Sequence, residues 1–131
     1  MDWKWNETAG RYYDADTGRF LSRARVLDYV DDSIAATESA TDLLASYVAD
    51  DMLSPGDWRL LMREEIKREY IRQYTLGRGG VAQMTQADWG SIGGMLKEQY
   101  KYLDGFAGQV ADMSEGAIRS RSRMYIRSAR E

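Results

Sequence analysis

The residues best suited to chemistry in this sequence are acids and arginines, because the chain contains no histidine and no cysteine. The usual general base, the commonest metal ligand and the thiolate zinc sites are therefore missing. Carboxylates come in adjacent pairs at Asp31-Asp32, Asp50-Asp51 and Glu64-Glu65. Neighbouring residues on a helix point about 100° apart, so no such pair converges on one proton or metal. We predict no catalytic and no cofactor-binding residue; a small carboxylate-based hydrolase, whose acids would meet only in the fold, is the enzyme alternative.

The spacing of Asp14 and Asp16 resembles the start of a calcium loop. Such a loop needs glycine at the position of Arg19 and a bidentate glutamate at the position of Arg25. We therefore predict no metal site and interpret these residues as part of a turn.

A stripe of arginines marks the end of the chain. Five arginines and no acid occur from Arg119 to Arg130 in a chain whose net charge is −3. On a helix, the spacing of three or four residues places Arg119, Arg123, Arg127 and Arg130 along one stripe. Guanidinium groups suit phosphates and carboxylates, so these are candidates for contact with DNA or an acidic partner. The alternative, which we favour, is a solvated face or pairing with the chain's own acids.

Four sites along the chain share one pattern that is typical of a helix start. An apolar residue precedes a hydroxyl N-cap, and another apolar residue follows at the fourth helical position. The caps are Ser22, Ser54, Thr85 and Ser114. We predict helices over 22–51, with a kink or break between Ala35 and Thr41, and over 54–76 with an end at Gly77.

Two more helices complete the prediction, over 86–111 and 115–130. Gly90 and Gly94, one turn apart in the third helix, suggest either a close approach of another backbone or, with Gly105, a weak and broken helix.

The N-terminal stretch is rich in aromatic residues. Turn chemistry at 14–18 separates two short strand-like runs and predicts a β-hairpin over 11–21, preceded by an extended arm. Partner-binding candidates are Trp3, Trp5, Tyr12, Tyr13 and Phe20. For the two tryptophans the alternative, which we favour, is that they cover the chain's own core.

The expected architecture is mainly α: an arm and hairpin over 1–21, then a helical domain over 22–131 with three to four long antiparallel helices. No stretch is apolar enough for a membrane span, so we expect no membrane contact. The helices look too long and the hairpin too isolated for a self-sufficient globule. We therefore expect many copies or a large partner.

Several stretches together resemble the N-terminal part of tailed-phage minor head (head-morphogenesis) proteins. The matching stretches are Arg11-Tyr12-Tyr13-Asp14, Thr17-Gly18-Arg19-Phe20-Leu21-Ser22, Met62-Arg63-Glu64-Glu65-Ile66-Lys67, Leu76-Gly77-Arg78-Gly79-Gly80, Gln83-Met84-Thr85-Gln86-Ala87-Asp88-Trp89 and Ser122-Arg123-Met124-Tyr125. The hairpin alone also resembles the repeat of rearrangement-hotspot shell proteins, but those are long β arrays.

The first resemblance implies a virion structural protein without a catalytic role, assembled in the host cytoplasm. Its implied partners are phage capsid or portal proteins, with possible contact to packaged DNA. A helical nucleic-acid-binding module that uses the arginine stripe is the alternative from another class.

Overall fold

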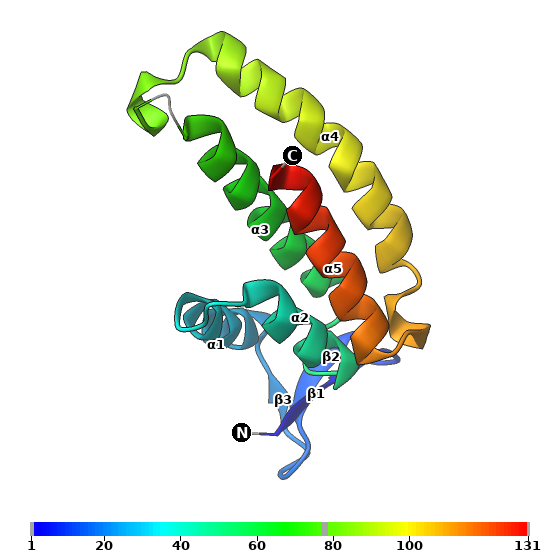
Figure 1. Cartoon of the computed structure of the whole chain (residues 1–131). Coiled ribbons are helices and arrows are strands. Elements are labelled where there is room, and N and C mark those ends of the chain that lie inside the picture. Colours follow the sequence, from blue (N-terminus) through cyan, green and yellow to red (C-terminus); the bar gives the residue numbers. More distant parts are fainter. Residues whose placement is uncertain (1, 77–78, 131) are drawn as a thin grey trace.

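The computed structural model describes residues 2–76 and 79–130, and in them a small antiparallel sheet precedes a set of helices (Figure 1). The predicted mainly α fold with a small N-terminal hairpin is confirmed. In chain order the elements are β1 (Trp3–Asn6), β2 (Arg11–Asp14), β3 (Phe20–Leu21), α1 (Arg23–Ala35), α2 (Ala40–Ala49), α3 (Pro55–Thr75), the 3-10 turn η1 (Val81–Gln83), α4 (Gln86–Ala107), the 3-10 turn η2 (Val110–Asp112) and α5 (Glu115–Arg130).

The stretch that was expected to be an extended arm is a strand of the sheet. β1 pairs antiparallel with β2, with Trp5 opposite Tyr12, and β2 pairs with β3 as the predicted hairpin. The Trp3 indole N–H donates to the Met52 carbonyl at 3.0 Å, and the Trp5 amide donates to the Asp51 carbonyl at 2.6 Å. These bonds fasten the strand to the turn before α3, and a pattern of residues cannot reveal such distant partners.

All four predicted helix caps are confirmed. Each hydroxyl accepts the amide hydrogen of the residue three positions on, at 3.2 Å for Ser22, 3.0 Å for Ser54, 3.2 Å for Thr85 and 3.3 Å for Ser114. At Thr85 the Asp88 carboxylate also accepts the Thr85 amide, which completes a capping box. The residues immediately around each cap are therefore sufficient to predict where these helices begin.

The predicted interruption of the first helix is a complete break. α1 ends at Ala35, and α2 begins at Ala40 after an irregular connection. The small, weakly apolar residues of this stretch provide little burial to carry one helix through it.

Within the described chain no other backbone approaches Gly90 or Gly94, so the first of the two interpretations of the α4 glycines is wrong for contacts inside the chain. A Cβ added at Gly90 or Gly94 would meet nothing within 4 Å beyond the adjacent backbone of its own helix. α4 instead ends at Ala107, two residues beyond Gly105, and η2 follows. The predicted helix end at Gly77 lies outside the described residues.

α3 is the central helix, and its contacts with α2, α4 and α5 form the core. The consecutive helices α3, α4 and α5 alternate in direction, so α4 is antiparallel to both neighbours and α5 lies beside α3 in the same direction (Figure 1). The largest fully buried side chains come from both the sheet and the helices: Trp3, Tyr12, Trp58, Leu44, Leu53, Met62, Ile66, Ile92, Leu103, Ile118, Val26 and Val30. The sheet is therefore part of the core and not an isolated hairpin.

Candidate functional site

The buried face of α5 decides where its arginines lie. Ile118, Ser122, Tyr125 and Ala129 recur every three or four residues and are buried against the core. The small Ser122 donates its hydroxyl hydrogen to the Ile118 carbonyl at 2.7 Å, so it is satisfied within the helix. The arginine stripe consequently runs along one margin of α5, beside α2 and α3.

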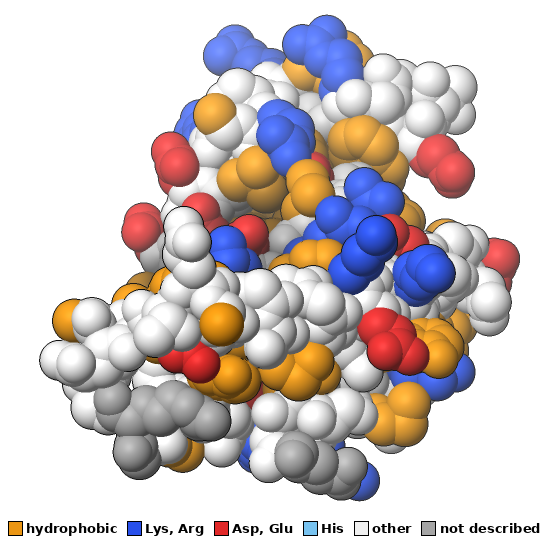
Figure 2. All heavy atoms as spheres, turned by 90° about the horizontal axis from the view of Figure 1, so that it is seen from above, with side chains coloured by type: hydrophobic (Ala, Val, Ile, Leu, Met, Phe, Trp, Pro, Cys, Tyr) orange, Lys and Arg blue, Asp and Glu red, His pale blue; other side chains and the backbone are white. Residues whose placement is uncertain are grey.

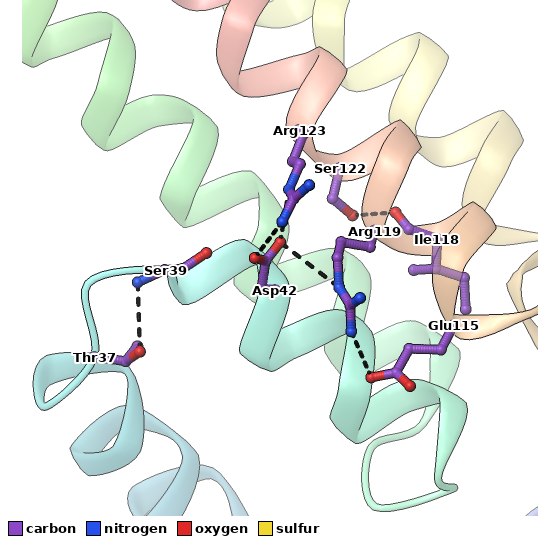
Figure 3. Close-up of polar contacts among 8 residues, drawn as sticks. All are labelled: Thr37, Ser39, Asp42, Glu115, Ile118, Arg119, Ser122 and Arg123. Carbon is purple, nitrogen blue, oxygen red and sulfur yellow. Dashed lines mark hydrogen bonds and ion pairs between the residues drawn. The ribbon is translucent and has the colours of Figure 1, made fainter.

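Two arginines of the stripe join α5 to α2 through Asp42. The Arg123 guanidinium donates to both carboxylate oxygens of Asp42, at 3.0 and 2.7 Å, and Arg119 approaches the same carboxylate at 3.9 Å (Figure 3). Arg119 also donates to Glu115 at 2.9 Å. The hydrogen bond from Arg123 lowers the pKa of Asp42. These two arginines therefore hold the helices together, as the favoured alternative predicted.

A third arginine joins α5 to α3. Arg130 donates to Glu69 at 2.8 Å, and Arg72 and Gln73 donate to the same oxygen at 3.3 and 3.0 Å. Burial by itself raises the pKa of Glu69, but the hydrogen bonds from Arg130, Gln73 and Arg72 outweigh it and lower the pKa overall. The single negative charge of Glu69 is therefore shared by Arg72 and Arg130, and it neutralises the two arginines only in part.

These helices enclose a groove of about 510 Å³ between the α1–α2 connection, α3 and α5. Arg68 pairs with Glu65 in its lining, and burial raises the pKa of Glu65. Arg127 is exposed and forms no ion pair within the described part of the chain. The charged lining residues are five arginines and three glutamates: Arg68, Arg72, Arg123, Arg127, Arg130, Glu38, Glu65 and Glu69. We call this the arginine groove; its lining is net positive although the chain is net negative.

The surface of the molecule shows the same mixture of charges. Seen from above, Lys and Arg side chains gather near the middle of the face, with acidic and hydrophobic side chains directly beside them (Figure 2). This surface is therefore mosaic and lacks the unbroken positive field that suits a nucleic-acid backbone.

The predicted partner-binding aromatics differ in exposure. Trp3 and Tyr12 are each only 1% exposed, so within this chain their side chains belong to its own core. For Trp3 this is the alternative we favoured. Trp5 and Tyr13 are half-buried, and Phe20 is half exposed, with the Arg11 guanidinium 4.1 Å from its ring centre. Phe20 is thus the most accessible of the five.

A buried polar network, which sequence reasoning missed, explains why Tyr12 points inward. Its hydroxyl donates to Asp57 at 2.6 Å and accepts the Ser54 amide at 3.0 Å. Arg23 adds two hydrogen bonds to the other oxygen of Asp57, at 2.9 and 2.7 Å. Burial and the hydrogen bond to Asp57 raise the pKa of Tyr12 to about 12. The network joins β2, α1 and the start of α3.

The remaining chemistry-bearing residues have local roles. The Asp14 carboxylate accepts the amides of Asp16 and Thr17 at 2.8 and 3.3 Å, so it shapes the hairpin turn. Over residues 2–76 and 79–130, no group of three or more His, Cys, Asp or Glu side chains is arranged to hold a metal ion.

A second hollow, of about 440 Å³, lies between α4 and α5. Tyr102 and Met124 stand exposed at its edges, and Arg121 lies 5.2 Å from the ring centre of Phe106. The hollow is smaller and carries less charge than the arginine groove.

Comparison with known proteins found no matching family model, no matching curated protein and no matching solved structure. None of the helices in the described ranges is both long and apolar enough to cross a bilayer.

Proposed function

We propose that this chain is a structural component of a phage virion that acts in head assembly through protein–protein contacts. The resemblance to minor head proteins suggests the setting, and the arginine groove is the observation that carries the proposal. Its net positive lining, with the half-buried Ile34 and Ile126 among the charges, suits an acidic, partly apolar protein surface.

The groove suits a protein better than it suits DNA. Glu65 and Glu69 lie among the arginines and would repel a continuous phosphate backbone. Most of the arginines are already engaged by the chain's own acids, so few counterions would be released on binding DNA. A steep loss of DNA affinity with rising salt would contradict this reading and favour the nucleic-acid alternative.

The hydrolase alternative has one observation in its favour. The pKa of Glu65 is raised and that of Glu69 is lowered, as in an acid–base pair. One oxygen of each carboxylate, Oε1, is nevertheless bound by arginines, and both groups lie in a cation-rich lining with no nucleophile of the described residues placed between them. We therefore prefer the assembly role.

The proposal is tested in the phage or prophage that encodes the chain. We expect mass spectrometry of purified heads to detect the protein, and deletion of its gene to lower the yield of filled heads. Arg127→Glu should reduce incorporation into heads, because it places an acid in the groove without breaking an ion pair of the described residues.

Lys101→Glu is the matched control, since Lys101 is exposed on α4 and lies outside the groove. It makes the same change in net charge and should leave incorporation unchanged. A gene with no phage context, or heads that lack the protein, would overturn the proposal.

A further inference from the structure

The outward face of α1 carries exposed acids that pair with none of the described residues of the chain. Asp28, Asp31 and Asp32 are exposed and form no ion pair with any residue in 2–76 or 79–130. From Asp28 to Ala35 the helix carries these three acids and no base. Arg23 and Arg25 lie in the first turn of α1, so the negative charge is concentrated in the second half of the helix.

The position of these acids is unfavourable for α1 itself. α1 ends at Ala35 with no basic residue in its last turn, so Asp31 and Asp32 lie near the negative end of the helix dipole. Acids stabilise a helix at its start and destabilise it at its end. A cationic surface packed against these acids would remove that penalty.

The spacing of the acids matches that of the arginine groove. Asp28 and Asp32 are one helical turn apart, a rise of about 6 Å. Arg68 and Arg72 on α3 have the same spacing, as do Arg123 and Arg127 on α5. Glu65 and Glu69 have the same spacing on α3, so an α1 helix would lie along the α5 wall of the groove, where Arg127 forms no ion pair with the described residues.

We infer that the arginine groove binds the acidic α1 face of a second copy of this chain. The inference rests on the proposed assembly role and names the partner of the same groove. Tyr29, 42% exposed beside the acids, supplies an apolar contact for Ile34 and Ile126 of the groove. The two surfaces adjoin on one molecule, because Ile34 of α1 lines the groove, so the contact is compatible with a reciprocal two-fold dimer as well as with a head-to-tail array.

Sedimentation of the purified full chain over a range of concentrations tests the inference. We expect reversible association at about 0.05 M salt that weakens at about 0.5 M, because salt screens charges on an exposed interface. Asp31→Lys should weaken association about tenfold or more. This change also improves the charge at the end of α1, so it does not act by unfolding the helix.

Charge reversal on the other side tests the partner surface. Arg127→Glu alone should weaken association to a similar extent, and the double variant Arg127→Glu/Asp31→Lys should partly restore it. Lys101→Glu and Asp16→Lys, at exposed sites on α4 and the hairpin turn, are the matched controls and should leave association unchanged.

The inference is overturned if the chain stays monomeric at low salt. It is also overturned if neither Asp31→Lys nor Arg127→Glu changes the association. If the chain does not self-associate but still enters heads, and Arg127→Glu reduces that incorporation, only the identity of the partner is wrong. If it also fails to enter heads, the proposed function fails with it.

Discussion

At the scale of single residues, the Tyr12 hydroxyl joins three elements that are far apart in the sequence. It bonds Asp57 and Ser54 at the start of α3, and Asp57 in turn holds Arg23 of α1. Each partner is a common surface residue type, and the buried network arises only because the sheet packs on these two helices.

Tyr12→Phe should lower the free energy of unfolding by about 1–3 kcal/mol, because it leaves the buried Asp57 and the Ser54 amide each short of a hydrogen-bond partner. Urea denaturation at neutral pH measures the change. Tyr13→Phe is the control, since Tyr13 is half-buried and its hydroxyl forms no hydrogen bond with residues 2–76 or 79–130; it should change the free energy much less. Equal effects would show that the network is unimportant.

Asp42 provides a pH-dependent prediction. The pKa of Asp42 is lowered in the folded chain by the Arg123 hydrogen bond. A lowered pKa stabilises the fold above the unfolded value of about 3.9, and this contribution is lost as pH falls through the folded pKa.

Asp42→Asn should therefore destabilise the chain at pH 7, and the difference from the natural chain should shrink as the pH falls below the unfolded value and through the lower folded pKa. Denaturant titrations at several pH values measure it. A difference that stays constant across this range would mean that the carboxylate charge is irrelevant there.

At the scale of elements, the glycines of α4 are open positions in a helix. A Cβ at Gly94 would have no neighbour within 4 Å beyond the adjacent backbone of its own helix, and the Gly94 backbone is helical. Glycine in a helix interior costs about 0.5–1 kcal/mol relative to alanine.

Gly94→Ala should consequently raise the free energy of unfolding of the isolated chain by about 0.5–1 kcal/mol. Thermal or urea unfolding measures the gain, and Ser91→Ala, another exposed substitution in the same helix, should give a smaller one. A clear destabilisation would mean that the position is packed after all.

At the scale of the whole molecule, the sheet and the helices share one core. Trp3 lies in that core, 1% exposed, and its indole N–H is bonded to Met52 between α2 and α3. The division at residue 21 that the sequence suggests is therefore a change of secondary structure within a continuous hydrophobic cluster.

Trp3→Ala should lower the free energy of unfolding by about 3–5 kcal/mol, because it removes a large buried side chain and leaves a cavity. Far-UV and near-UV circular dichroism should still report one shared transition. Trp89→Ala, at a site 40% exposed, should cost much less. Separate transitions for sheet and helices would contradict a shared core.

The sequence by itself determined the local events of this fold. A hydroxyl cap with its flanking apolar residues requires only a few neighbouring residues, so the starts at Ser22, Ser54, Thr85 and Ser114 were predictable. The break after Ala35 and the hairpin over 11–21 were predictable for the same reason.

Only the tertiary structure decided whether each aromatic or arginine side chain is buried, paired or exposed. Partners of Trp3, Arg123 and Arg130 lie 49, 81 and 61 residues away in the chain, and no local pattern encodes such pairings. The arginine groove exists because α5 lies parallel to α3, as Figure 1 shows. This packing brings the arginines of α5 beside the arginines and glutamates of α3. Spacing along one helix predicts a stripe, but packing between helices decides whether that stripe is satisfied internally or left open to a partner.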